Sequence, residues 1–200
     1  MTLRFLLAHG AGASSASGWM RRYAEHLATL GSVRSFDYPY MRGGARKAPD
    51  KLDVLVAAHT AELMALRAES AATDKLVLAG KSMGSRVGCH LTLDEGAGKV
   101  AGLVCFGYPL RGQNGKLRDE VLLALRTPIL FVQGTRDKLC ELPELEVVRA
   151  RMTAPSQLCV IEGGDHSLEV TKTQLKQTGA TQASVELGIL ARVRAFCDEL

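Results

Sequence analysis

The sequence predicts an α/β fold in which a mainly parallel sheet of about six strands is covered by helices on both faces. Short apolar runs recur along the chain, and longer runs with helical spacing separate nearly all of them. The short runs are apolar throughout instead of alternating with polar residues, which is typical of parallel strands buried on both faces. The predicted strands are residues 3–8, 33–37, 75–79, 100–106, 128–133 and 157–161.

The most regular of the predicted helices runs from about residue 51 to residue 69. Its apolar side chains recur every three or four residues and therefore share one helix face. They are Leu52, Leu55, Val56, Leu63 and Leu66, with His59 among them. Similar patterns predict helices at residues 18–30, 84–93, 142–152 and 185–200, whereas the Thr- and Gln-rich residues 171–184 predict a surface excursion.

Composition limits the number of domains and the classes of partner. The 200 residues, 46% of them hydrophobic, suffice for one domain over residues 1–200 and not for two ordinary ones. The net charge is +4, but Lys and Arg form no continuous stripe, so no nucleic-acid partner is expected. No apolar run approaches the roughly 20 residues that span a bilayer, so no membrane partner is expected either.

Five cysteines are spread along the chain, and none forms a C-x-x-C pair. We therefore expect no metal site and no cofactor. An odd number of thiols, together with the lack of a secretory signal pattern, predicts reduced cysteines in a cytoplasmic protein, with the nucleus as an alternative.

The motif with the clearest chemistry is a G-x-S-x-G pattern centred on Ser82. A predicted strand precedes it and a helical pattern follows it. A serine on such a strand-to-helix turn is lifted out of the sheet, and Gly80 and Gly84 let the two segments pass closely. The amide of Met83 would then face an oxyanion near the helix N-terminus. A phosphate-binding loop is excluded because it needs a glycine at position 75, where the chain has Lys75.

A nucleophilic serine needs a base and an acid that orients the base. Of the five histidines, His166 follows the last predicted strand in a Gly-rich turn and is the predicted base. Asp137, after the penultimate strand, is the predicted acid, which gives the order Ser, Asp, His along the chain. Asp119 or Asp37 could replace it only if the strand topology differs from the predicted one. Core or surface packing is the better account of His26, His59 and His90.

Further candidates lie on loops at the same predicted sheet edge. His9 precedes a Gly-rich turn in which the amide of Ala11 or a neighbour could be a second oxyanion donor, with a purely structural turn as the alternative. A set of apolar and aromatic residues could line a substrate pocket together with His9, or could pack between loops: Tyr38, Tyr40, Tyr108 and Leu110. A set of basic residues could attract an acidic acyl group, although a solvated loop is the favoured interpretation: Arg42, Arg46 and Lys47.

With these residues in place, the chain resembles a small α/β-hydrolase-like family along nearly its whole length. That family includes the testis-expressed hydrolase-like protein, its plant and bacterial relatives and a domain of a chromatin-complex subunit. The resemblance is carried by the segments at residues 9–12, 19–20, 36–40, 79–86, 107–110, 133–137 and 163–167. It implies a compact core without a lid domain, related to dienelactone hydrolases and carboxylesterases, with Ser82, Asp137 and His166 as its triad.

Two functions from different classes follow. The first is a serine hydrolase, resembling carboxylesterases, that cleaves a small-molecule ester or thioester through an acyl-enzyme on Ser82. The second is a non-catalytic module that keeps the hydrolase scaffold to bind a protein partner, as the chromatin-associated relatives suggest. The complete set of Ser82, Asp137 and His166 favours the first.

Overall fold

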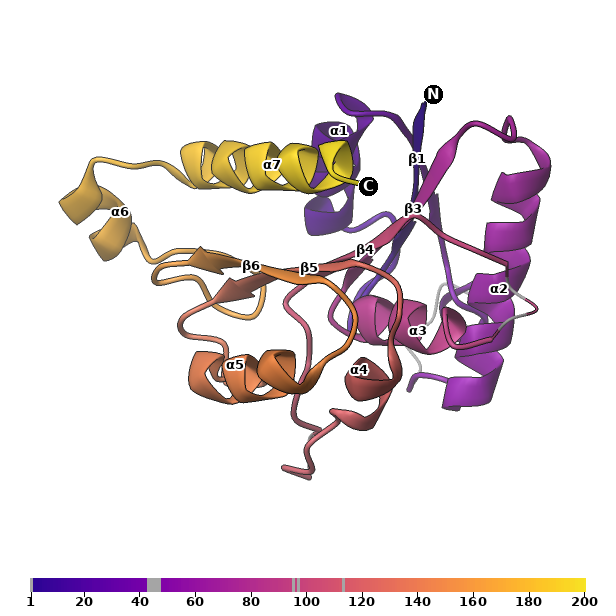
Figure 1. Ribbon diagram of the computed structural model, residues 1–200. Coiled ribbons are helices and arrows are strands. Elements are labelled where there is room, and N and C mark those ends of the chain that lie inside the picture. The colour runs from indigo at the N-terminus through magenta and orange to yellow at the C-terminus, as the bar shows by residue number, and fades with distance from the viewer. Residues whose placement is uncertain (1, 43–47, 95, 97, 113) are drawn as a thin grey trace.

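The computed structural model describes residues 2–42, 48–94, 96, 98–112 and 114–200 (Figure 1). Six strands form one sheet in the order β2-β1-β3-β4-β5-β6, and every neighbouring pair is parallel. The strands are β1 (Leu3–Ala8), β2 (Ser32–Phe36), β3 (Lys75–Lys81), β4 (Gly102–Phe106), β5 (Ile129–Gly134) and β6 (Ser156–Ile161). The predicted parallel sheet is confirmed.

Helices cover the sheet on both faces, as Figure 1 shows. One face carries α1 (Gly18–Ala28) and α7 (Gln182–Asp198), and the other carries α2 (Leu52–Ala68), α3 (Met83–Leu91), α4 (Glu120–Ala124) and α5 (Leu142–Arg151). Successive strand residues point to opposite faces. In β1, therefore, Phe5 and Leu7 join the cluster under α1 and α7, whereas Leu6 and Ala8 join the cluster over α2 and α3.

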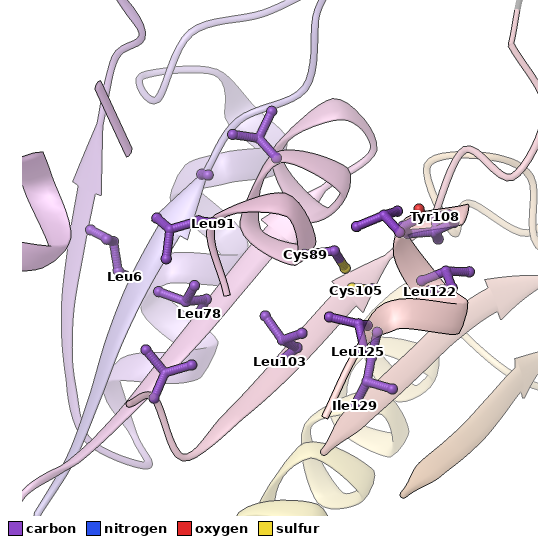
Figure 2. Packing of buried hydrophobic residues seen from close by; sticks show 14 of the residues in the cluster. Leu6, Leu78, Cys89, Leu91, Leu103, Cys105, Tyr108, Leu122, Leu125 and Ile129 are labelled. Carbon is purple, nitrogen blue, oxygen red and sulfur yellow. The ribbon is translucent and has the colours of Figure 1, made fainter. Parts of the chain in front are cut away.

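The two apolar clusters explain why the strands are apolar throughout. All residues of β4 and β5 are buried. Figure 2 shows the cluster on the α2 to α5 face, where Leu78, Leu103 and Ile129 of three strands meet Leu91 and Leu122 of the helices. Burying each such side chain contributes about 1.5–3 kcal/mol relative to leaving it exposed. This packing fixes the sheet that positions the loops at its edge.

Two features differ from the sequence prediction. Residues 171–184, expected to form a surface excursion, contain α6 (Lys172–Thr178). The Thr171 side chain caps the N-terminus of this helix by accepting a hydrogen bond from the Gln174 amide. None of its residues is buried, so it has no apolar face from which to predict it. A short 3-10 helix, η1 (Pro39–Met41), also follows β2.

The state of the cysteines and the lack of a membrane-spanning segment are two further predictions from the sequence. All five cysteines are free and buried. Within the described ranges, no helix combines the length and the apolar character needed to cross a membrane.

Candidate active site

The serine of the G-x-S-x-G motif occupies a one-residue turn between two elements. Strand β3 ends at Lys81 and helix α3 begins at Met83. Ser82, between them, has φ 51° and ψ −113°, a conformation that side-chain-bearing residues rarely adopt and that costs about 1–3 kcal/mol. Two hydrogen bonds hold the turn. The Ser82 amide donates to the Phe106 carbonyl at 2.9 Å, and the Ser85 hydroxyl donates to the Ser82 carbonyl at 2.6 Å.

The two glycines of the motif are required by the close approach of backbone segments. A Cβ atom on Gly84 would lie 2.4 Å from the Ala8 carbonyl oxygen. A Cβ atom on Gly80 would lie 2.3 Å from the Ser85 amide nitrogen. Both distances are far below van der Waals contact. The start of α3 is therefore packed directly against β1 and β3, which places Ser82 at the carboxyl edge of the sheet.

At this edge, three side chains form one line of hydrogen bonds. The Ser82 hydroxyl lies 2.7 Å from His166 Nε2, and His166 Nδ1 lies 2.7 Å from Asp137 Oδ2. A carboxylate accepts only, so Nδ1 carries the proton and Nε2 is left to accept from the serine hydroxyl. The structure thus brings together Ser82 after β3, Asp137 after β5 and His166 after β6.

Asp137 is held in a buried hydrogen-bond network. Its Oδ1 accepts from the Leu139 amide at 2.8 Å, and its Oδ2 accepts from the Gln133 side-chain amide as well as from His166. Gln133 is fully buried in β5, and its oxygen accepts from the Tyr108 amide at 3.0 Å. The Tyr108 bond fixes which end of the Gln133 amide is the donor. Sequence reasoning missed this role, although a glutamine in an apolar strand four residues before the acid is a usable signal.

We expect Gln133→Leu to lower kcat about tenfold and to destabilise the fold by roughly 1–3 kcal/mol, because Asp137 loses a donor and the buried Tyr108 amide loses its acceptor. Ester turnover and urea unfolding measure the two effects. Gln157→Leu is the control, since that amide bonds the exposed Glu199, and it should change stability by less than about 0.5 kcal/mol. Unchanged kcat in Gln133→Leu would show that Asp137 does not need this support.

The loop after β1 is oriented by buried side chains behind it. His9 Nε2 accepts from the Tyr38 amide at 3.1 Å, so its Nδ1 carries the proton and donates to the Gly10 carbonyl at 2.7 Å. Burial lowers the pKa of His9, in keeping with a neutral ring. Asp37 Oδ1 lies 3.7 Å from the same Nε2, but a nitrogen that already accepts a proton forms no ion pair with it. The Tyr40 hydroxyl lies within hydrogen-bond distance of the carbonyls of Gly10 and Ala11, at 3.4 and 3.2 Å.

These contacts determine where the loop amides point. In a trans peptide, the N–H of one residue is antiparallel to the carbonyl of the residue before it. Because the Gly10 carbonyl faces His9 and Tyr40, the Ala11 N–H points away from both side chains. Ala11 itself lines a cavity beside Ser82. The Met83 amide begins α3 and has no intrahelical acceptor. Neither the Ala11 amide nor the Met83 amide donates a hydrogen bond to another of the described residues.

Removing the Tyr40 hydroxyl should loosen this loop. We expect Tyr40→Phe to lower kcat about tenfold with little change in KM, less than the roughly 10²–10³-fold that accompanies complete loss of one oxyanion donor. Steady-state ester hydrolysis measures both constants. The control is Tyr23→Phe, since the Tyr23 hydroxyl is buried and has no partner among the described residues. Equal rates for the wild type and Tyr40→Phe would refute the orienting role.

A cavity of about 340 Å³ opens beside Ser82 and His166. Its wall is mostly apolar and is built by residues 10–13, by the start of α1 and by Lys81 and Ser167. Trp19 of α1 donates from Nε1 to the Ser167 carbonyl at 2.9 Å, and this bond ties the helix to the loop that carries His166. A larger hollow of about 770 Å³ lies at the opposite edge, among residues that begin β3 and precede β4 and β5, and contains none of the three hydrogen-bonded side chains.

Comparison with known proteins shows which family the chain belongs to. The profile of the alpha/beta hydrolase domain family matches residues 1–197. The chain belongs to this family. The chain is also similar to a serine hydrolase without a lid from Xanthomonas campestris, with a TM-score of 0.67, 19% identity and coverage of 94% of this chain and 80% of that one.

Two other solved structures share the fold of this alpha/beta hydrolase. A dienelactone hydrolase from Anabaena variabilis has a TM-score of 0.66 and 21% identity, covering 94% of this chain and 83% of its own. One of two metagenome-derived lipolytic enzymes has a TM-score of 0.72 and 17% identity, covering 100% and 94%. The predicted compact α/β-hydrolase fold is confirmed.

The structure corrects the predicted substrate pocket of this alpha/beta hydrolase. None of the five residues expected there lines the cavity beside Ser82: His9, Tyr38, Tyr40, Tyr108 and Leu110. All five are buried. The four from the loops after β2 and β4 join the apolar cluster formed with α2 and α3, and His9 directly follows β1. His9 and Tyr40 act from behind the cavity wall. Trp19 and Lys81 line the cavity instead.

The other histidines and acids of the hydrolase lie outside the hydrogen-bonded line. His59 is fully buried, and burial lowers its pKa to about 3, which fits the predicted packing role. His26 contacts Glu186 at 3.0 Å. Asp165, next to the base, accepts from the amides of residues 167 and 169 through its Oδ1.

The basic loop and the candidate metal ligands lie apart from the cavity. Arg42 donates to the Asp37 carbonyl at 3.0 Å and contacts Glu62, whereas Arg46 and Lys47 lie outside the described residues. Within the part of the chain that the structure describes, no cluster of three or more His, Cys, Asp or Glu side chains is arranged to hold a metal ion.

Proposed function

We propose that this protein is a serine hydrolase that cleaves small carboxylic esters or thioesters through an acyl-enzyme on Ser82. The observation that carries the proposal is the unbroken line of hydrogen bonds from Ser82 through His166 to Asp137, with both links at 2.7 Å. A serine, a neutral imidazole and a buried carboxylate in this order are the parts needed to activate a hydroxyl for attack.

In the proposed mechanism, Ser82 Oγ attacks the carbonyl carbon while His166 Nε2 takes the hydroxyl proton. Asp137 keeps the proton on Nδ1 and stabilises the imidazolium that forms. The amides of Met83 and Ala11 stabilise the oxyanion, at about 3–4 kcal/mol for each donor. His166 then gives its proton to the leaving alcohol or thiol. A water attacks the acyl-enzyme by the same steps and restores Ser82.

The cavity supports small substrates. About 340 Å³ is near the lower limit for small-molecule sites, and the mostly apolar wall suits a short acyl chain. Some of the similar structures are described as esterolytic or lipolytic enzymes, and one as a dienelactone hydrolase, which supports an ester as the substrate. We also propose membership of the narrower group named from the motifs above, and residence in the cytoplasm with the nucleus as the alternative.

Pre-steady-state hydrolysis of p-nitrophenyl acetate tests the proposal. An acyl-enzyme that hydrolyses more slowly than it forms releases a burst of p-nitrophenol equal to the concentration of active sites. We expect such a burst from the wild-type protein. Absence of both burst and steady turnover with this ester, in protein shown to be folded, would contradict the proposed activity.

A further inference from the structure

The residue before the nucleophile places a cation at the cavity. Lys81 ends β3, and its side chain lines the cavity together with Ser82 and His166. Its Nζ donates to the His166 carbonyl at 2.8 Å and lies 5.2 Å from the centre of the Trp19 ring. An ammonium has three N–H donors, and only one of them has a hydrogen-bond acceptor among the described residues.

Among the described residues, no carboxylate forms an ion pair with this cation, since its contacts are the His166 carbonyl and the Trp19 ring. The carboxylates of Asp137, Asp165 and Glu169 raise the pKa of Lys81 electrostatically without forming an ion pair with it. A partly buried charge is costly unless it is paired, and this one stands in a mostly apolar wall. A bound anion at this wall would balance the charge.

We infer that the substrate of this site carries a carboxylate on its acyl part, and that Lys81 binds this carboxylate while Ser82 attacks the ester carbonyl. The inference rests on the proposed hydrolase function and narrows its substrate class. Lys81 and Ser82 both line the cavity, so an acyl chain of a few carbons that ends in a carboxylate can contact both residues. A charge-assisted hydrogen bond in an apolar wall discriminates strongly against a neutral analogue.

A purely structural role for Lys81 makes a different prediction. The His166 carbonyl is also crowded by Gly107, which has φ 61° and whose added Cβ would lie 2.5 Å from that oxygen. If Lys81 only fastened the His166 loop, its loss would slow every ester by the same factor. If Lys81 binds the substrate carboxylate, its loss lowers kcat/KM more for esters with a charged acyl part than for neutral esters. The ratio of the two kcat/KM values therefore separates the two roles.

The test compares phenyl hydrogen glutarate with phenyl 5-oxohexanoate. Both acyl parts have three methylene groups and the same number of non-hydrogen atoms, and they end in a carboxylate or a methyl ketone. We expect the wild type to favour the carboxylate by about tenfold or more in kcat/KM at about pH 7. Lys81→Met should bring this ratio to about one. The control Lys176→Met, at an exposed position on α6, should keep the wild-type ratio.

The pH dependence adds a second readout. Burial lowers the pKa of Lys81 to about 8, against the opposing effect of Asp137, Asp165 and Glu169. Because kcat/KM reports the free enzyme, the preference for the carboxylate should be full below about pH 8 and fall as the pH rises through that value. The ketone ester has a neutral acyl tail. Its kcat/KM in the wild type, divided by its kcat/KM in Lys81→Met, should therefore stay constant as the pH rises through about 8.

The outcomes separate the inference from the function beneath it. A wild-type ratio near one, with clear turnover of the ketone ester, would overturn carboxylate recognition and leave the hydrolase intact. An equal loss on both esters in Lys81→Met would likewise overturn it in favour of the structural role. No turnover of either ester, and no burst with p-nitrophenyl acetate, would overturn the hydrolase itself.

Discussion

Ser82→Ala is expected to lower kcat for ester hydrolysis by roughly 10⁶-fold, the loss typical of removing a serine nucleophile. The Ser82 hydroxyl forms the hydrogen bond to His166 at 2.7 Å, and alanine, which lacks it, cannot form the acyl-enzyme. The fold should hardly change, because the two hydrogen bonds that fix this turn use the backbone of residue 82. Initial rates with p-nitrophenyl acetate and thermal unfolding measure the two effects.

The control for Ser82→Ala is Ser35→Ala, which removes an exposed hydroxyl from the edge strand β2. It should leave rate and stability within the error of the wild type. If Ser82→Ala keeps more than about a hundredth of the wild-type rate, another nucleophile or simple general-base hydrolysis must carry the reaction. If a cellular effect of the protein survives Ser82→Ala, the interaction-module alternative is favoured.

Asp137→Asn is expected to lower kcat by about 10⁴-fold, through the proton on His166 rather than through geometry. The Leu139 amide donates to Oδ1, so the amide oxygen of an asparagine is drawn to that position and its NH₂ group takes the place of Oδ2. That NH₂ group would donate to His166 Nδ1 and leave the proton on Nε2, facing Ser82. Nε2 could then no longer accept the serine proton.

The hydrogen bonds around Gln133 oppose the side-chain rotations that would return the His166 proton to Nδ1 in Asp137→Asn. Turning the side-chain amide of the substituted asparagine around would leave the Leu139 amide without its acceptor. Turning the Gln133 amide would break its bond from the Tyr108 amide. Asp165→Asn is the matched control, since its Oδ1 alone accepts the amides of residues 167 and 169 and an asparagine keeps that oxygen. A rate for Asp137→Asn within about tenfold of wild type would contradict the assigned role of the acid.

The sheet and the approximate position of the site could be predicted from the sequence because both follow from local patterns. Apolar runs separated by helical spacing predict buried parallel strands, and parallel strands bring the ends of β1, β3, β5 and β6 to one edge. Ser82, Asp137 and His166 stand just beyond three of those ends. Their meeting could thus be predicted from chain order and strand position alone.

What the sequence did not reveal depends on the paths of loops and the direction of side chains. Tyr38 and Tyr108 follow strand ends in the same way as the site residues, yet their loops turn into the core. Lys81 looks like a surface residue in sequence, and only the turn at Ser82 brings it into the cavity wall. Gln133 becomes meaningful only when its amide is seen between Asp137 and Tyr108.

The most direct test of the central claim is covalent labelling of the wild-type protein with a fluorophosphonate, followed by peptide mapping of the modified residue. The reagent phosphonylates a serine only when a base activates it and the cavity admits the probe. We predict one label per chain, on Ser82, that is lost in Ser82→Ala and strongly slowed in Asp137→Asn. A folded protein that takes up no label, or takes it up on another residue, would contradict the assignment of Ser82 as the nucleophile.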